Sequence, residues 1–169
     1  APTRELANQI ALEIRKLSRH IHNLKVLTLC GGTPFKPQVL SLSHGAHIIV
    51  ATPGRVLKHI EQNNIDLENI NTLVLDEADK MLDMGFYEDI MQIVKYLPKE
   101  RQTIMFSATM PAKIQQLAKT ILNNPAEIKL AVSRPADKII QAAYVCYENQ
   151  KLGIIRSLFT DEVPERVII

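Results

Sequence analysis

Three carboxylates, Asp76, Glu77 and Asp79, fall within four positions directly after the apolar run at 73–75. A carboxylate at the end of a buried strand can hold Mg²⁺ beside nucleotide phosphates, while its neighbour positions a water for attack. In that interpretation Asp76 serves the metal and Glu77 serves the water. The alternative is an ordinary helix N-terminus, where the macrodipole stabilises each acidic residue by about 0.3–1 kcal/mol. The acidic cluster alone leaves both interpretations open.

Two hydroxyl residues, Ser107 and Thr109, flank a single alanine after the apolar run at 104–106. If this loop lies beside the acidic cluster, both hydroxyls can donate hydrogen bonds to Asp79. They can also cap a helix that begins near Pro111. Capping explains one hydroxyl, but it does not explain why a small residue separates two of them.

A second group combines glycine, threonine and arginine, which suit contact with a sugar–phosphate backbone. Glycine permits close backbone approach, threonine offers a hydroxyl, arginine offers a charge, and amides at a helix N-terminus favour phosphate. The candidates are Pro2, Thr3, Arg4, Gly32, Thr52, Gly54 and Arg55. Taken singly, the pair Gly31 and Gly32 and the stretch 52–55 are also ordinary turn sequences. Aromatic residues are only 5% of the chain, which favours backbone contact over base stacking.

Short apolar runs alternate with stretches of helical period, which predicts an α/β fold with a parallel sheet and helices on both faces. The predicted strands are 25–29, 47–51, 72–75 and 103–107, and the predicted helices are 3–21, 54–62, 86–97 and 111–122. In the first helix, Leu6, Ile10, Ile14 and Leu17 form an apolar stripe. Loops that leave parallel strands meet at one edge of the sheet, so both groups of candidate residues should converge there.

Composition narrows the class of protein further. The chain has 169 residues, 20 Lys and Arg against 18 Asp and Glu, and a net charge of +2, so any nucleic-acid contact must be local. Cys30 and Cys146 lie far apart and match no metal or disulfide pattern, which indicates a reducing intracellular compartment, cytoplasmic or nuclear. No apolar run approaches the ~20 residues of a membrane span, so we expect no membrane partner.

The composition changes near Pro135, which suggests two domains. We expect a first domain at 1–132 whose last strand is 126–130, a polar linker at 133–138, and the start of a second domain at 139–169. Within the second domain the pattern predicts a strand at 139–148, a helix at 149–159 and a strand at 166–169. This opening βαβ unit is too small to form a core alone.

The segments PTRELA, GG, TPGR, DEAD and SAT, in this order and spacing, resemble motifs Ia to III of DEAD-box ATP-dependent RNA helicases. Each motif alone is weak, but five in order are specific, and RVII at the end is similar to the start of motif IV. The resemblance implies a first RecA-like domain that lacks its N-terminal part, followed by the beginning of a second RecA-like domain. It also implies ATP and Mg²⁺ as cofactors and RNA as a partner bound without regard to sequence.

The resemblance also implies a role for each candidate residue. Asp76 would hold Mg²⁺ through water, Glu77 would orient the hydrolytic water, and Asp79 would couple to Ser107 and Thr109, linking ATP state to RNA binding. Residues along the RNA path would be Pro2, Thr3, Arg4, Gly32, Thr52, Gly54 and Arg55. Unwinding would separate strands locally, by bending one strand between the two domains.

The sequence departs from the family pattern at its ends. No G-x-x-x-x-G-K-[ST] phosphate-binding loop occurs in the chain. We therefore expect a fragment of a helicase that is not catalytically competent as an isolated chain. Two alternatives stay open: a nucleic-acid-binding module that does not hydrolyse ATP, and a DNA helicase of the same superfamily 2.

Overall fold

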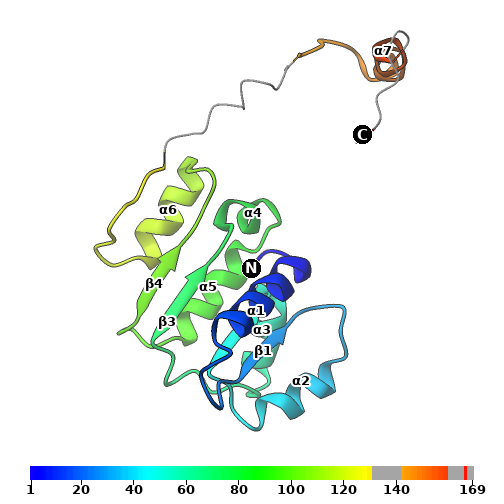
Figure 1. Cartoon of the computed structure of the whole chain (residues 1–169). Coiled ribbons are helices and arrows are strands. Elements are labelled where there is room, and N and C mark those ends of the chain that lie inside the picture. The colour runs from blue at the N-terminus through cyan, green and yellow to red at the C-terminus, as the bar shows by residue number, and fades with distance from the viewer. Residues whose placement is uncertain (131–141, 160–165, 167–169) are drawn as a thin grey trace. The chain divides into compact units, whose positions relative to one another are not determined.

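The computed structural model describes residues 1–130, 142–159 and 166 (Figure 1). The chain divides into two compact units, residues 1–126 and residues 127–169, and each is described by itself. The predicted linker at 133–138 lies outside the described residues. The domain limits at 132 and 139 therefore stay a prediction.

The first unit is built on four parallel strands arranged as two pairs. Strand β1 (Val26–Leu29) pairs with β2 (Ile48–Ala51), and β3 (Thr72–Leu75) pairs with β4 (Gln102–Met105). Leu29 lies opposite Ala51, and Leu75 lies opposite Met105. The two strands of each pair therefore end at the same position along the sheet. The predicted parallel α/β architecture is confirmed. The fourth strand begins one residue earlier and ends two residues earlier than the predicted 103–107.

In the first unit, four helices match the predicted ones, and two short helices were not predicted. The matching helices are α1 (Arg4–Leu17), α3 (Pro53–Glu61), α5 (Tyr87–Tyr96) and α6 (Ala112–Ile121). The additional helices are α2 (Phe35–Leu42) and α4 (Ala78–Asp83). Each comes after a strand, α2 after β1 and α4 after β3, and neither is long enough to show a full periodic apolar stripe.

Helix α1 ends four residues before the predicted end at residue 21 because Ser18 caps it. Both the backbone N–H and the hydroxyl of Ser18 donate to the carbonyl of Ile14, at 2.9 and 2.6 Å. The buried face of α1 centres on Ala7 and Ala11, whereas Leu17, a member of the predicted stripe, is 84% exposed. Small alanine side chains let the helix approach the strands closely.

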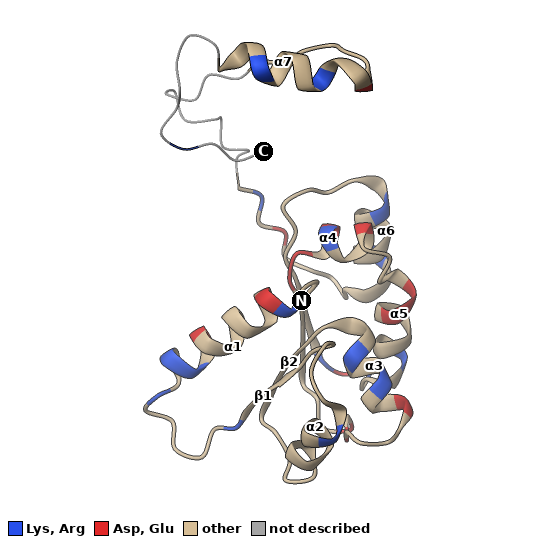
Figure 2. Ribbon diagram, turned by 90° about the vertical axis from the view of Figure 1, so that its right-hand side faces the viewer, with Lys and Arg blue, Asp and Glu red and all other residues tan. Residues whose placement is uncertain are grey.

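Helices cover both sides of the strands, as predicted. Helix α1 packs against β1 and β2, and Figure 2 shows α3 and α5 on the opposite side of these strands. One core cluster joins α1 to the first strand pair and consists of Ala7, Ala11, Val26, Cys30 and Val50. The other lies around the second pair and consists of Leu75, Ala78, Met81, Ile90, Ile114, Leu117 and Ile121. Helices α3 and α5 pack against each other, and this contact joins the part of the first unit around β1 and β2 to the part around β3 and β4.

The predicted strand at 126–130 is wrong. The structure describes these residues without regular secondary structure, and Ile128 and Leu130 are 86% and 87% exposed. A strand is defined by the hydrogen bonds to its neighbour, and no described strand pairs with this segment. Apolar composition alone therefore gave a false strand.

The described part of the second unit contains a 3₁₀ turn (Glu148–Gln150) followed by α7 (Lys151–Leu158), which confirms the predicted helix at 149–159. The predicted strand at 139–148 is not present over 142–148. The predicted strand at 166–169 lies outside the described residues except for Arg166. Within the described ranges, no helix is long and apolar enough to cross a membrane.

Candidate nucleotide and nucleic-acid site

The N-terminal turn reaches the ends of β2 and β3. The terminal ammonium of Ala1 donates to the carbonyl of Ala51 at 2.9 Å, which places the following residues beside the end of β2. The nitrogen of Ala1 also lies within electrostatic range of the carboxylates of Asp76 and Glu77. The N-terminal turn, the end of β2 and the acidic cluster therefore lie at one edge of the first unit.

The acidic cluster adopts a left-handed turn that the sequence did not indicate. Glu77 has φ 50° and ψ 52°, and it separates β3 from α4. Such a backbone costs about 1–3 kcal/mol for a residue other than glycine and is concentrated at functional sites. The N–H of Glu77 donates to Oδ1 of Asp76 at 3.0 Å, which fixes the orientation of that carboxylate. Because α4 begins only at Ala78, Asp76 and Asp79 do not share a helical face.

Glu77 is half-buried and forms an ion pair one helical turn along the chain. Its Oε2 lies 3.1 Å from Nζ of Lys80, although the angle of a directed hydrogen bond is not met. Both side chains are partly solvated, so this pair contributes little to stability. Glu77 occupies the N-cap position of α4 but makes no side-chain capping bond.

Asp79 links the acidic cluster to the loop after β4. Its Oδ2 accepts hydrogen bonds from the backbone N–H and the hydroxyl of Thr109, at 2.9 and 2.8 Å. The hydroxyl of Ser107 accepts from the N–H of Asp79 at 3.2 Å and donates to the carbonyl of Thr109 at 2.7 Å. The predicted proximity of the three residues is present, but Ser107 bonds the backbone and not the carboxylate.

The capping alternative for Ser107 and Thr109 is wrong. The N-cap residue of α6 is Pro111, and no side chain caps that helix. Both hydroxyls instead serve the junction with Asp79. Burial opposes ionisation of Asp79, but hydrogen bonds from the hydroxyl and amide of Thr109 and from the Lys80 amide outweigh it and hold the pKa of Asp79 below its ordinary value.

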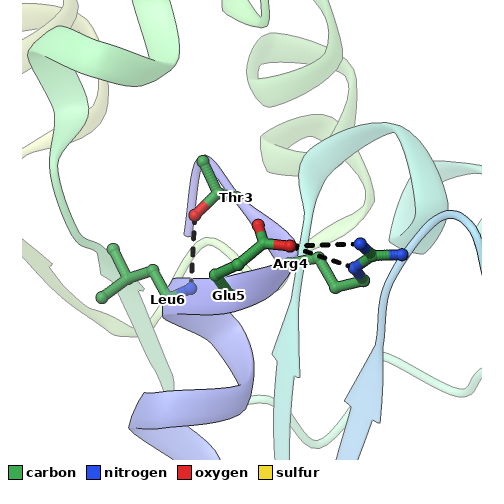
Figure 3. Close-up of polar contacts among 4 residues, drawn as sticks. All are labelled: Thr3, Arg4, Glu5 and Leu6. Atoms are coloured by element: carbon green, nitrogen blue, oxygen red, sulfur yellow. Dashed lines mark hydrogen bonds and ion pairs between the residues drawn. The ribbon is translucent and has the colours of Figure 1, made fainter. Parts of the chain in front are cut away.

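Arg4 lies against the glycine loop that follows β1. Gly32 has φ +74°, and a Cβ at this position would lie 2.8 Å from Nη1 of Arg4. Arg4 also pairs with Glu5 at 3.2 Å, and the hydroxyl of Thr3 accepts from the N–H of Leu6 at 3.2 Å (Figure 3). Thr3 is therefore the N-cap of α1, and its own hydroxyl hydrogen remains a possible donor to a ligand. Close approach of Arg4 explains why glycine stands at position 32.

Arg55 spans two loops at the end of the first strand pair. Its Nη1 donates to the carbonyl of Thr33 and to Oε1 of Gln38, both at 3.0 Å. The guanidinium carbon lies 5.5 Å from the centre of the Phe35 ring. Gly54, which precedes Arg55, faces α5, because a Cβ there would lie 3.3 Å from Oδ2 of Asp89.

Thr52 and Pro2 complete the placement of the predicted residues. Thr52 donates its N–H to the carbonyl of Leu29 at 3.1 Å, which continues the β1–β2 pairing by one step. It occupies the N-cap position of α3 without a side-chain capping bond, so its hydroxyl does not cap the helix. Pro2 is fully buried, so its role in this structure is packing.

A magnesium ion has one candidate carboxylate here, Asp76. Among the described residues, no group of three His, Cys, Asp or Glu side chains is arranged to hold a metal. Mg²⁺ usually keeps several waters and binds through one or two carboxylates together with substrate phosphates. The single oriented carboxylate of Asp76 therefore fits a water-mediated site and not an all-protein metal cage.

Three residues near Arg55, namely Phe35, Gln38 and His59, were missed by the sequence analysis. His59 follows Arg55 by four positions and so shares its helical face, which was an available signal. Phe35 and Gln38 lie in α2, which was not predicted. Their contacts depend on how α2 packs beside α3.

Parallel strands with an acidic turn and arginine-bearing loops at one edge are the arrangement of nucleotide-dependent α/β domains. The family model for DEAD/DEAH box helicase matches residues 1–117. The chain belongs to the DEAD/DEAH box helicase family, and its first unit has the predicted RecA-like fold.

Curated relatives match almost the whole chain. It is 42% identical over 168 residues to the ATP-dependent RNA helicase DbpA of Escherichia coli (strain K12), covering 99% of this chain and 37% of that protein. It is 41% identical over 170 residues to the DEAD-box ATP-dependent RNA helicase CshA of Geobacillus kaustophilus (strain HTA426), covering 100% of this chain and 36% of that protein. The chain thus spans little more than a third of these relatives.

Solved structures show the same likeness. A DEAD box protein from the hyperthermophile Methanococcus jannaschii matches with a TM-score of 0.70 and 44% identity, over 73% of this chain and 34% of that one. The yeast DEAD-box splicing factor Prp28 matches with a TM-score of 0.69 and 37% identity, over 73% and 30% of the two chains.

Proposed function

We propose that this chain is part of an ATP-dependent RNA helicase that couples Mg-ATP hydrolysis to RNA binding and local duplex unwinding. The observation that carries the proposal is the Asp79–Thr109 junction, which ties the acidic turn to the loop after β4. Arg4 lies against the loop after β1, and Arg55 lies in the first turn of α3, just after the end of β2. The names of DbpA and CshA support the assignment to RNA.

Asp76 and Glu77 are assigned to the nucleotide. Asp76 would hold Mg²⁺ through water, and when bound this ion neutralises charge on the phosphates. Glu77 would accept a hydrogen bond from the attacking water and orient it toward the γ-phosphate. The left-handed backbone of Glu77 turns the chain between β3 and α4, so the two neighbouring carboxylates do not continue one helical face.

Asp79, Ser107 and Thr109 are assigned to coupling. A shift of the acidic turn that accompanies ATP hydrolysis would pull on Thr109 through two hydrogen bonds to one carboxylate oxygen. Bonds to a charged group are stronger than neutral ones, so this junction can transmit a displacement between loops.

RNA would bind along the loops after β1 and β2 and along the N-terminal turn. The assigned residues are Pro2, Thr3, Arg4, Gly32, Thr52, Gly54 and Arg55. Arginines and hydroxyls contact phosphate and sugar, which position a strand without reading its sequence. Pro2 contributes by packing under the turn, since it is buried.

The proposal is tested with the natural full-length protein, by measuring ATP turnover alone, with unrelated single-stranded RNAs and with DNA of matching sequences. We expect RNA to stimulate turnover without regard to sequence and DNA to have little effect. Equal stimulation by DNA would identify a DNA helicase of the same superfamily. RNA binding without ATP turnover would identify a non-hydrolysing binding module.

A further inference from the structure

The side chain of Gln38 joins the loop that follows β1 to helix α3, which begins just after β2. Its Nε2 donates to Oγ1 of Thr33 at 2.7 Å and to the carbonyl of Cys30 at 3.2 Å, both in the first loop. Its Oε1 accepts from Nη1 of Arg55 at 3.0 Å and lies 2.9 Å from Nε2 of His59, both in α3. One amide therefore makes four polar contacts and connects two segments about twenty residues apart in sequence.

The surroundings of Gln38 hold its amide in one orientation. His59 is fully buried, and its ring stacks on Phe35 with 4.1 Å between centroids and 8° between planes. Since Oε1 of Gln38 accepts from Arg55, Nε2 of His59 is the nitrogen that carries the proton. This leaves Nδ1 as a buried acceptor without a hydrogen-bond partner among the described residues. A buried group left unsatisfied is costly, so the contacts of the ring with Phe35 and Gln38 hold it in place against that cost.

We propose that Gln38, supported by His59 and Phe35, is a positioning residue that holds Arg55 ready for an RNA phosphate and makes the loop after β1 and the start of α3 act as one surface. The inference rests on the proposed role of Arg55 in RNA binding. It adds three residues that lie outside the assigned site, Phe35, Gln38 and His59.

The geometry supports this function because the cluster restrains Arg55 without occupying all its donors. Both hydrogen bonds to Thr33 and Gln38 use Nη1, whereas a guanidinium has five N–H donors in a planar fork. The Phe35 ring supports one side of the group. Immobilising a long side chain before binding removes part of the entropy that RNA binding would otherwise have to overcome.

A neutral amide suits this position better than a carboxylate. A carboxylate would accept from Arg55 and compensate its charge, which would weaken the attraction of Arg55 for a phosphate. It would also have no hydrogen to donate to Thr33 or to Cys30. Glutamine both donates and accepts, so it connects the loops and leaves the arginine positively charged.

The experiment is a double-mutant cycle in the full-length protein with Gln38→Met, Arg55→Ala and the combined variant. Methionine keeps the length and volume of Gln38 but removes its hydrogen bonds. We expect Gln38→Met to weaken single-stranded RNA binding about two- to tenfold, the range for ordering one flexible side chain. In the Arg55→Ala background the same change should have no further effect. Fluorescence anisotropy with a labelled RNA measures all four affinities.

A second readout separates positioning from a general structural role. Gln38→Met should raise the RNA concentration that half-activates ATP turnover and leave the turnover rate at saturating RNA unchanged. Gln62→Met, at the end of α3, is the matched control and should match the wild type in both measurements. A thermal melt of each variant verifies that the fold is retained.

The outcomes distinguish the inference from the proposed function. If Arg55→Ala binds RNA normally, the role of Arg55 itself is wrong. If Arg55→Ala weakens binding but Gln38→Met does not, the positioning role of Gln38 is wrong. An equal loss from Gln38→Met with and without Arg55 would show that Gln38 acts through another group, and that also overturns the inference.

Discussion

The two strand pairs end in junctions of opposite chemistry. At the β3–β4 end, the carboxylate of Asp79 collects two hydrogen bonds from Thr109. At the β1–β2 end, the amide of Gln38 connects Thr33 with Arg55. Both junctions use one side chain to join two loops that are distant in sequence. The comparison indicates that the charge of the surrounding groups decides whether a carboxylate or an amide can join the two segments.

The electrostatic surroundings explain this difference. Asp79 faces only donors, which favour its ionised form, so its pKa lies below the ordinary value despite burial. Beside Gln38 the charged neighbours are cationic. Burial, followed by the charges of Arg55 and Lys58, lowers the pKa of His59 and keeps that ring neutral. The first junction concentrates negative charge, whereas the second leaves positive charge on Arg55.

The largest expected effect tests the acidic end. Glu77→Gln in the full-length protein should lower the rate of ATP hydrolysis about 10²–10⁴-fold, because the amide keeps the shape but cannot act as a base toward water. ATP-dependent RNA binding should persist. Single-turnover hydrolysis at saturating RNA measures the rate. Glu88→Gln, in the first turn of α5, is the control, and a wild-type rate for Glu77→Gln would remove Glu77 from the mechanism.

A smaller effect separates coupling from chemistry. Replacing Ser107 and Thr109 with alanine should spare much of the hydrolysis and slow strand separation on the order of tenfold or more. Hydrogen bonds to a charged group contribute about 1.5–3 kcal/mol, and the change removes the Thr109 hydroxyl from Asp79. A duplex-unwinding assay run beside an ATPase assay measures both. Thr120→Ala in α6 is the control, and equal losses in the two assays would contradict a coupling role.

At the end of the first strand pair, Arg4 and Arg55 should bind RNA through their positive charge. Arg4→Ala and Arg55→Ala should each weaken binding similarly for unrelated RNAs. Each should also reduce the slope of log affinity against log salt by about 0.7, the value for one phosphate on a single strand. Titrations at several salt concentrations measure the slope, with Lys119→Ala in α6 as a control. A strongly sequence-dependent loss would indicate contact with bases.

The smallest effect concerns the pH dependence of stability. The pKa of His59 is lower in the folded state, so the unfolded state takes up the proton more readily and the free energy of unfolding falls as pH drops below about 6.5. The groups that face the ring are Phe35, Gln38, Arg55 and Lys58. Urea unfolding from pH 7.5 to 5.5 measures this loss, which His59→Gln should reduce.

The variant His22→Gln, which replaces an exposed histidine, is the control for that measurement and should retain the wild-type pH dependence. An unchanged pH dependence in His59→Gln would show that the neutral ring makes no contribution to acid sensitivity. It would also weaken the contrast between the two junctions, because the cationic surroundings of Gln38 would then be without consequence for His59.

The local hydrophobic pattern predicted helices and strands well where its period agrees with the burial of the residues in the structure. The runs around Leu29 and Leu75 became strands because each is apolar and ends in a polar loop. The same reasoning failed around Ile128 and Val145, where apolar residues are exposed and no described strand pairs with them. Strand formation depends on a partner, and a single sequence window contains no information about that partner.

The sequence by itself determined the parallel α/β class, the order of the motifs and the identity of the acidic and arginine-bearing loops. These features follow from periodicity and from residue type, which are local properties of the chain. Only the tertiary structure decided the left-handed turn at Glu77, the contact of Asp79 with Thr109, and the position of Gln38 between Thr33 and Arg55. The physical reason is that these contacts require two or three segments distant in sequence to lie close together in space. The packing of α2, α3 and the strand ends determines which segments do so.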